Sequence, residues 1–227
     1  MNSQTLPKLF DLSCVQMYNT QSEVEELVRV AEKYGFAHIT TLQCFLSFAR
    51  KKIGNSSHIK LIGNIGFPSG TDSTTVKAVQ AREMMPICDE IDMVMNVSML
   101  KSGQFKQVEE DVREIRKVLD GITMKVIIES PYLTDDEIRA ACEIVANSGA
   151  DYVKTGTGWG KPVSLDNVKL IKSVVEDRVA IKASGGVSNL DQLILMHEAG
   201  AARFGVNMKS GIAILNEMLA REGAVNN

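Results

Sequence analysis

The sequence predicts a (β/α)₈ barrel, the TIM-barrel architecture, formed as one domain over residues 1–227. Short apolar runs, many of them β-branched, alternate along the chain with charged segments of helical periodicity. Eight strand–helix units in about 200–250 residues match the number of units and the usual length of this barrel. No linker or low-complexity tract divides the chain. A doubly wound open sheet is the alternative, but it usually has fewer strands, and its nucleotide-binding fingerprint is missing here.

The eight predicted strands are apolar along most of their length, as expected for a parallel sheet that is covered on both faces. They are expected at residues 9–15, 36–42, 59–67, 90–97, 123–130, 150–156, 178–184 and 202–207.

Between the strands, apolar residues recur at spacings of three and four, as Val108, Val112 and Ile115 do. Several of these segments end in a glycine, such as Gly35 and Gly149, which is typical of a helix C-terminus. The pattern predicts helices over residues 22–35, 74–85, 104–121, 135–149, 165–177 and 189–200, with weaker ones over 43–53 and 211–221.

Composition excludes several classes of protein. With 44% hydrophobic residues and a net charge of −3, the chain is not disordered. No apolar run approaches the roughly 20 residues of a membrane span. Residues 1–8 lack the apolar region of a secretory signal, so we expect a cytoplasmic protein. The balance of 25 basic to 28 acidic residues gives no sign of a nucleic-acid or membrane surface.

The cysteines and histidines are too scattered to form a recognisable metal site or redox pair. In a cytoplasmic chain, we expect the cysteines to be reduced thiols. We therefore predict no metal and no cofactor. The residues concerned are Cys14, Cys44, Cys88, Cys142, His38, His58 and His197.

Four lysines accompany the strand runs, and a barrel places its chemistry at the C-terminal ends of its strands. Lys154 and Lys182 follow their apolar runs, in DYVKT and VAIKA, and should lie at that end. They belong to the sixth and seventh strands, which are neighbours in a barrel. Lys60 and Lys125 precede their runs and are expected at the opposite, inert face.

Two neighbouring ammonium groups disfavour each other's charge, so one pKa should fall. Moving a lysine pKa from about 10.4 to near 7 takes roughly 4–5 kcal/mol of differential interaction. Burial and a second cation supply such an effect, and the neutral amine then attacks a carbonyl to form a Schiff base. The alternative is that each lysine pairs with a carboxylate or extends its amine to solvent. The residues alone do not say which lysine is the nucleophile.

Asp92 lies within an apolar strand, where a carboxylate is costly unless it is paired. It is either a structural ion-pair partner of a barrel lysine or a proton relay beside the reactive amine. Both interpretations place it near a lysine. Asp11 on the first strand and Glu129 at the end of the fifth are weaker cases of the same kind.

Glycines cluster after the late strands, in TGTGWGK (155–161), in SGG (184–186) and at Gly205. Loops at these places in a barrel often hold a phosphate through backbone N–H groups at a helix start, although plain turns have the same composition. Ser188 or Asn189 is expected to cap the helix that follows SGG.

With these residues identified, the chain resembles the deoxyribose-phosphate aldolase family of class I aldolases. The resemblance extends from about Asp11 to Leu215. The stretches that carry it, in order, are IGFPSG (65–70), EIDMVMNVSMLKSG (90–103), KVIIESPYLTDDEI (125–138), GADYVKTGTGW (149–159), IKASGGVSN (181–189) and SGIAIL (210–215).

The resemblance implies a (β/α)₈ barrel and reversible aldol cleavage without a metal. Lys154 in VKTGTG matches the Schiff-base lysine, and Lys182 in IKASGG matches the second lysine that activates the first. Asp92 in EIDMVMN matches the aspartate of proton transfer, and Asp11 in DLSCV the supporting aspartate of the first strand. The implied substrate-binding residues are Thr155, Gly158, Gly185, Gly186, Gly205 and Asn207.

The chain departs from the family pattern where the substrate is bound. The loop GGIRT becomes GGVSN, so that Ser188 replaces an arginine, and VKTST becomes VKTGT at Gly156. A serine pair after the strand-eight glycine becomes GVNMKSG, with Asn207 in that region and Lys209 added. The loop after the second strand reads TTLQCF, and the chain ends GAVNN, without the terminal tyrosine of some members.

The resemblance implies an aldolase that cleaves 2-deoxy-D-ribose 5-phosphate into acetaldehyde and D-glyceraldehyde 3-phosphate. The departures motivate an alternative, the same Schiff-base chemistry on another sugar phosphate or an unphosphorylated aldol. A third hypothesis is a barrel that binds a sugar phosphate without turnover. The expected partner is a phosphorylated sugar, and a homodimer or higher homo-oligomer is the base-rate expectation for a soluble enzyme.

Overall fold

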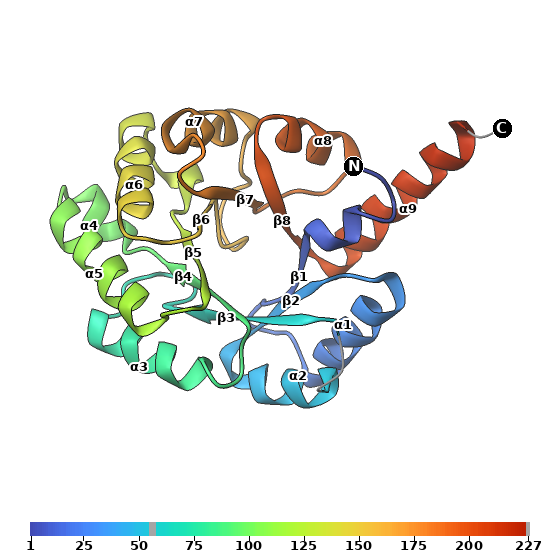
Figure 1. The fold of residues 1–227 in the computed structure, drawn as a ribbon, viewed down its shortest axis with the longest axis horizontal. Coiled ribbons are helices and arrows are strands. Elements are labelled where there is room, and N and C mark those ends of the chain that lie inside the picture. The colour runs from blue at the N-terminus through green and yellow to red at the C-terminus, as the bar shows by residue number, and fades with distance from the viewer. Residues whose placement is uncertain (55–57, 226–227) are drawn as a thin grey trace.

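The computed structural model describes residues 1–54 and 58–225, and within them eight parallel strands close into one barrel (Figure 1). Each strand pairs with its neighbour in sequence, and β8 pairs with β1 to complete the ring. The strands are β1 Phe10–Cys14, β2 His38–Thr41, β3 Lys60–Ile65, β4 Glu90–Val94, β5 Thr123–Ile127, β6 Tyr152–Lys154, β7 Ala180–Ser184 and β8 Ala201–Asn207.

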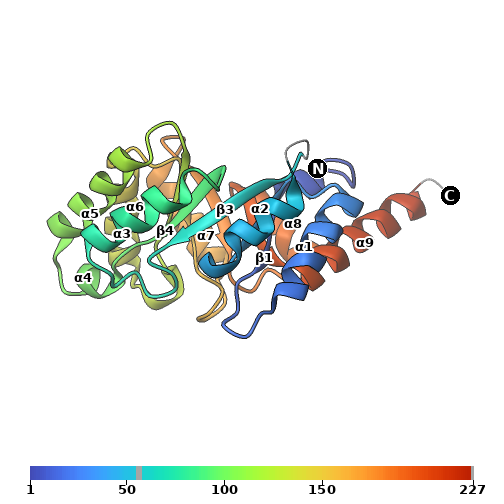
Figure 2. The ribbon, with the colours of Figure 1, turned by 90° about the horizontal axis from the view of Figure 1, so that it is seen from below.

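Helices surround the barrel on the outside, as Figures 1 and 2 show from two directions. The predicted (β/α)₈ architecture is confirmed, with a strand at each predicted strand range, although β8 begins one residue before its range, at Ala201. The helices are α1 Gln21–Tyr34, α2 Leu46–Ile53, α3 Thr74–Met84, α4 Val97–Lys101, α5 Phe105–Val118, α6 Asp135–Asn147, α7 Leu165–Val175, α8 Leu190–Glu198 and α9 Met208–Val225, with 3₁₀ turns at Leu6–Leu9, Gln43–Phe45 and Ser130–Tyr132.

The fourth unit differs from the prediction. The strand was expected to run to residue 97, but β4 ends at Val94 and the short helix α4 follows. The reason is Asn96, whose side chain accepts a hydrogen bond from the backbone N–H of Met99 at 3.1 Å and so starts a helix. The last helix is longer than its predicted range of 211–221, since α9 begins immediately after β8.

Side-chain caps explain where several helices begin. Thr20, Thr134 and Ser164 form capping boxes at the starts of α1, α6 and α7. Asn189 is one of the two residues predicted to cap α8. Its side chain accepts a hydrogen bond from the backbone N–H of Gln192 at 2.9 Å. At the other end of α1, Gly35 adopts the left-handed conformation that glycine permits at a helix terminus.

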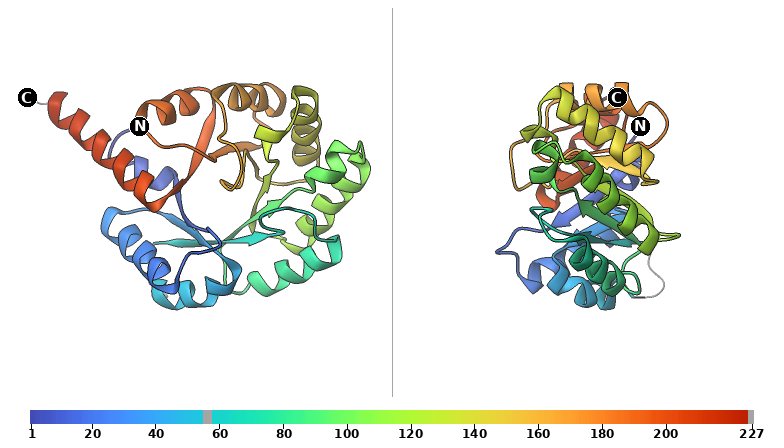
Figure 3. Two further views of the ribbon diagram at one scale, coloured as in Figure 1. Left: turned by 180° about the vertical axis from the view of Figure 1, so that it is seen from behind. Right: turned by 90° about the vertical axis from the view of Figure 1, so that its left-hand side faces the viewer.

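Helix α9 runs outward from the barrel, beside the N-terminal segment (Figures 1 and 3). The Glu222 carboxylate on α9 accepts a hydrogen bond from the backbone N–H of Ser3 at 2.8 Å, which joins the two ends of the described chain. No helix in residues 1–54 and 58–225 is long and apolar enough to cross a bilayer. The four cysteines are free thiols, of which Cys44 is exposed.

Strand register determines which side chains meet inside the barrel. Lys154 on β6 is paired with Lys182 on β7, and Asp92 on β4 is paired with Lys125 on β5. The Cβ atoms of successive strand residues alternate between the two faces of a sheet, so a matched register brings these side chains to the same face. All four side chains are buried, so a charged layer lies within an otherwise apolar barrel.

Candidate active site

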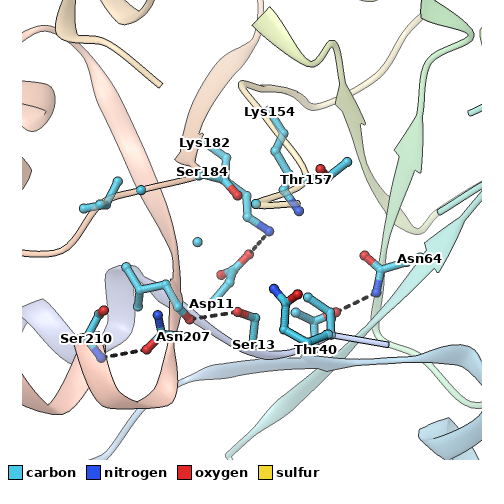
Figure 4. Close-up of a pocket in the computed structure, with 18 of the residues that line it drawn as sticks. Asp11, Ser13, Thr40, Asn64, Lys154, Thr157, Lys182, Ser184, Asn207 and Ser210 are labelled. Atoms are coloured by element: carbon cyan, nitrogen blue, oxygen red, sulfur yellow. Dashed lines mark hydrogen bonds and ion pairs between the residues drawn. The ribbon is translucent and has the colours of Figure 1, made fainter. Parts of the chain in front are cut away.

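A cavity of about 140 Å³ opens at the C-terminal end of the barrel strands (Figure 4). Its walls come from strands β1, β2, β3, β6, β7 and β8 and from the loops that follow β6 and β7. Lys154 and Lys182, the predicted catalytic lysines, both line it, and so does Asp11. The structure therefore brings three of the four predicted catalytic residues to the cavity wall.

Asp92, the fourth, lies beneath the two lysines and joins them. Lys154 Nζ and Lys182 Nζ each lie 2.7 Å from the same oxygen, Asp92 Oδ2. The two lysine nitrogen atoms therefore lie no farther from each other than twice this distance. Burial by itself would raise the pKa of Asp92, but Lys125, Lys154 and Lys182 hold it well below its usual range, so Asp92 is a carboxylate.

Lys182 is the deeper of the two lysines. Its side chain is fully buried, whereas that of Lys154 retains 5% exposure. Lys182 also forms an ion pair with Asp11, so two carboxylates hold its amine. Burial lowers the pKa of Lys182 to about 8, with contributions from Lys154 and Lys125, even though Asp11 and Asp92 oppose the change. This amine therefore exchanges a proton near neutral pH.

Lys125 was expected at the inert face of the barrel, but its amine belongs to the buried charged layer. Its Nζ lies inside the barrel, 3.0 Å from Asp92 Oδ1 and 2.7 Å from Glu90 Oε2. Burial would lower the pKa of Lys125, but Asp92, Asp11 and Glu90 raise it, so it remains an ammonium. The prediction was wrong because Lys125 lies beside Asp92 in the β4–β5 register and its side chain points into the barrel. Lys60, by contrast, is exposed.

Arg203 and His38 complete this layer and were missed by the sequence analysis. Arg203 donates from Nε to Asp11 Oδ1 at 3.0 Å and from Nη1 to Glu90 Oε2 at 2.7 Å. His38 lies between the same two carboxylates, and burial lowers its pKa to about 4. Arg203 had a signal of the same kind as Asp92, a single charge within an apolar strand.

The predicted substrate-binding residues divide into two groups. Thr155 is fully buried outside the cavity wall, and its hydroxyl exchanges two 2.8 Å hydrogen bonds with the backbone of Ser184. It therefore ties β6 to β7. The residues that do line the cavity are Gly158, Gly185, Gly186, Gly205 and Asn207.

Gly205 is required by close approach rather than by backbone conformation. A Cβ atom at this position would lie 2.7 Å from Ser184 Oγ, which is closer than real side-chain contacts allow. The Cε atom of Lys182 would lie 3.5 Å from the same Cβ atom. The absence of a side chain at residue 205 thus leaves room beside Ser184 and Lys182.

Glu129, the weakest of the predicted carboxylates, lies away from the lysine cluster. Its Oε2 accepts a hydrogen bond from the backbone N–H of Thr157 at 2.9 Å, which fixes the loop after β6. Gly156 permits this contact, because a Cβ there would lie 3.3 Å from Glu129 Oε1. The departure from the family pattern at residue 156 therefore coincides with a close packing contact.

Neutral hydrogen-bonding side chains on the early strands also line the cavity and were not predicted. Asn64 on β3 donates to Thr40 Oγ1 on β2 at 2.7 Å, and Ser13 on β1 donates to the carbonyl of Val206 at 3.1 Å (Figure 4). These positions gave no signal in sequence, because small polar residues are common in strands and only the closed barrel collects them at one end.

The family model of the DeoC/LacD family aldolases matches residues 9–219. The chain belongs to this aldolase family. A deoxyribose-phosphate aldolase of Rhizobium meliloti (strain 1021) is 39% identical over 220 residues, which are 96% of this chain and 89% of the relative. Among solved structures, an aldolase named QR15 superposes with a TM-score of 0.89 at 36% identity, covering 96% of this chain and 97% of that one. A deoxyribose phosphate aldolase from Aeropyrum pernix, described as a unique tetrameric structure, gives a TM-score of 0.84 at 27% identity, covering 96% and 93%.

Members of this aldolase family are aldehyde-lyases, and the lysine cluster has the chemistry that such an enzyme needs. An amine at the cavity wall, a second amine that exchanges protons near neutral pH, and a carboxylate that holds both are present within one charged layer. Across the described ranges 1–54 and 58–225, no three His, Cys, Asp or Glu side chains are arranged to hold a metal ion.

Proposed function

We propose that residues 1–227 act as one class I aldolase domain in which Lys154 forms a Schiff base with 2-deoxy-D-ribose 5-phosphate. One observation carries the proposal: the Lys154 amine lines the cavity and shares Asp92 Oδ2 with the amine of Lys182. Ligand binding without turnover does not require two lysine amines that share one carboxylate oxygen.

The surroundings of the two lysines support Lys154 as the nucleophile. Lys182 is fully buried and is held by Asp11 and Asp92 together, whereas Lys154 is held by Asp92 and keeps some exposure at the cavity. An attacking amine must reach a carbonyl carbon at the approach distance of a bond-forming pair. The less constrained lysine meets this condition with the smaller rearrangement.

In the proposed reaction, the Lys154 nitrogen adds to the C1 carbonyl of the open-chain sugar. Loss of water gives a protonated imine, which accepts the electron pair of the C2–C3 bond when that bond breaks. The C3 hydroxyl loses its proton and leaves as the aldehyde of D-glyceraldehyde 3-phosphate. The enamine left on Lys154 is protonated at C2, and water then releases acetaldehyde and restores the amine.

Proton movements in these steps fall to Lys182 and Asp92, acting on the substrate through a water molecule. Lys182, with a pKa of about 8, is able to give or take a proton near neutral pH. Asp92 keeps its negative charge and holds the two nitrogen atoms beside one another. Asp11 supports Lys182 from the other side and is itself fixed by Arg203.

The relatives support both the substrate and a homo-oligomeric assembly. Deoxyribose-phosphate aldolase is the name of the Rhizobium meliloti relative, and the Aeropyrum pernix structure is described as tetrameric. We infer that this chain also acts on a phosphorylated sugar and assembles with copies of itself. Sedimentation of the purified protein tests the second point, and a monomer at all concentrations contradicts it.

Borohydride trapping tests the proposed reaction. The protein is incubated with 2-deoxy-D-ribose 5-phosphate, reduced, digested and analysed by peptide mass spectrometry. We expect a reduced adduct on Lys154 that is absent from Lys154→Ala. An adduct on Lys182 instead contradicts the assignment of the nucleophile. No adduct with this sugar, with acetaldehyde or with any other carbonyl compound contradicts the aldolase and leaves a sugar-phosphate-binding barrel.

A further inference from the structure

One wall of the cavity is built from neutral polar side chains on the early strands. Thr40 on β2 and Asn64 on β3 line the cavity there, and both are buried, with 3% and 6% of their surface exposed. The proposed reaction uses neither residue, because its lysines and Asp92 lie on β6, β7 and β4. The Thr40–Asn64 pair is therefore a polar feature of the site that the proposed chemistry leaves without a role.

The side-chain amide of Asn64 is held in one orientation. Its Nδ2 donates to Thr40 Oγ1 at 2.7 Å and to the carbonyl of Thr41 at 3.2 Å. A backbone carbonyl only accepts hydrogen bonds, so the nitrogen rather than the oxygen of the amide must face Thr41. Both hydrogen atoms of the amide are thus used, and Oδ1 is turned away from these two partners.

The Oδ1 atom of Asn64 is the group that this wall offers to a ligand. Within residues 1–54 and 58–225 it accepts no hydrogen bond, and Figure 4 shows it on the cavity side of the amide. The Thr40 hydroxyl has no free hydrogen, because it donates to the carbonyl of Ile62 at 3.1 Å. The Thr40–Asn64 pair therefore presents acceptors but no donor to the cavity.

A surface of acceptors selects a hydroxyl of the substrate. A phosphate dianion brings no donor to such a surface. Open-chain 2-deoxy-D-ribose 5-phosphate has two hydroxyl groups, at C3 and C4. The C3 hydroxyl must lose its proton when the C2–C3 bond breaks, and an amide oxygen is too weak a base to take that proton. The C4 hydroxyl keeps its proton throughout the reaction and suits a neutral acceptor.

We propose that Asn64 is a specificity residue of this aldolase, whose Oδ1 accepts a hydrogen bond from the C4 hydroxyl of the sugar. In the condensation direction this group is the C2 hydroxyl of the acceptor, so the site favours 2-hydroxyaldehydes. The inference rests on the proposed Schiff-base function and names a contact that selects its substrate. Because Thr40 and Thr41 fix the amide before the substrate binds, little side-chain freedom is lost when the contact forms.

Two acceptors that differ in this hydroxyl test the proposal. Acetaldehyde is the donor, and the acceptors are D-glyceraldehyde 3-phosphate and 3-oxopropyl phosphate, which lacks the C2 hydroxyl. The measured quantity is the ratio of kcat/KM for the first acceptor to kcat/KM for the second. Asn64→Leu has a similar size but no acceptor atom, and we expect it to lower this ratio by at least about fivefold. A smaller fall overturns the inference.

The ratio distinguishes a contact with the substrate from a structural effect. The intrinsic reactivities of the two aldehydes are the same for every variant, and a loss of packing lowers both kcat/KM values together. Gln80→Leu is the matched control, because Gln80 Oε1 accepts from the backbone N–H of Gly66 at 2.8 Å and does not line this cavity. It disturbs the loop after β3 and should change the ratio by less than about twofold. A change in Gln80→Leu as large as that in Asn64→Leu overturns the inference.

Trapping with acetaldehyde separates this inference from the proposed function. Acetaldehyde has no hydroxyl, so its reduced adduct on Lys154 does not depend on Asn64 and shows that a variant has an intact site. No such adduct in the unmodified protein overturns the proposed function. A normal adduct together with an unchanged ratio in Asn64→Leu overturns this inference alone. If Asn64→Leu forms no adduct, Asn64→Val is measured in its place, with the same expected fall and the same limit.

Discussion

The side-chain amines of Lys154 and Lys182 meet at a single acceptor, each 2.7 Å from Oδ2 of Asp92. Two amines that share one buried oxygen are coupled, because a change of charge on either alters the hydrogen bond and the electrostatic energy of the other. The site is therefore a unit of three groups, and the predictions below treat it as one.

Removing the shared carboxylate should affect catalysis more than folding. Asp92→Asn keeps the shape but removes the anion of Lys154 and one of the two anions of Lys182, and we expect kcat to fall by about 10²–10⁴-fold. The control is Asp111→Asn, which breaks the buried 2.6 Å pair with Lys77 outside the cavity wall. Both variants should lose stability, on the order of 3 kcal/mol in urea unfolding. Equal kcat values in the two variants would contradict a role for Asp92 in the reaction.

The protonation of Lys182 should appear in the pH dependence of the reaction. Its pKa is lowered from 10.5 to about 8, so it is an ammonium below pH 8 and a neutral amine above. If the ammonium supplies protons during turnover, kcat/KM falls as the pH rises through about 8. In Lys182→Arg the charge persists, and this alkaline limb should disappear while activity at pH 7 drops. A flat wild-type profile from pH 7 to 9.5 would count against the assignment.

Arg203 should act on stability and on the position of Asp11. It bridges two buried carboxylates, Asp11 and Glu90, so Arg203→Met removes one of the cations that pair with each of them. We expect a loss of about 3–5 kcal/mol in the free energy of unfolding. Arg203→Lys should recover part of this loss, since it restores the charge but not the two-pronged geometry. A loss below about 1 kcal/mol in Arg203→Met would show that the layer adapts without the guanidinium.

His38 should make the protein less stable in mild acid. Burial lowers its pKa from 6.5 to about 4, so between these pH values the unfolded chain binds a proton that the folded protein does not. Stability therefore falls as the pH drops through this window, by about 2 kcal/mol between pH 7 and pH 5. Urea unfolding at both pH values measures the difference, and His38→Gln should reduce it by that amount. An unchanged difference in His38→Gln would show that other groups control the acid response.

Much of the fold could be predicted from the chain, because each barrel unit is encoded locally. Apolar strand runs, helical periodicity and terminal glycines such as Gly35 placed eight strands and most helices in order. The short helix α4 was missed because its signal is one capping residue, Asn96, inside what looks like a continuing strand. Local pattern thus predicted the number and order of the units better than their ends.

The buried charged layer shows which site residues local sequence pattern does not predict. Asp92 was identified because a charge inside an apolar strand is costly without a partner, and Lys154 and Lys182 were identified because they follow their apolar runs. Lys125 was assigned to the opposite face because it precedes its run, and this failed because the interior position of a side chain depends on register with the neighbouring strand. Arg203 was missed although it carries the same signal as Asp92, a single charge within an apolar strand.

The sequence by itself determined the architecture, the candidate lysines and the departures at residues 156, 188 and 207, because these follow from local pattern and from motifs. Only the tertiary structure decided that one oxygen of Asp92 serves both Lys154 and Lys182 and that Lys125 pairs with the other oxygen of the same carboxylate. Those facts depend on how eight strands close on one another, and barrel closure brings together side chains that no local pattern relates.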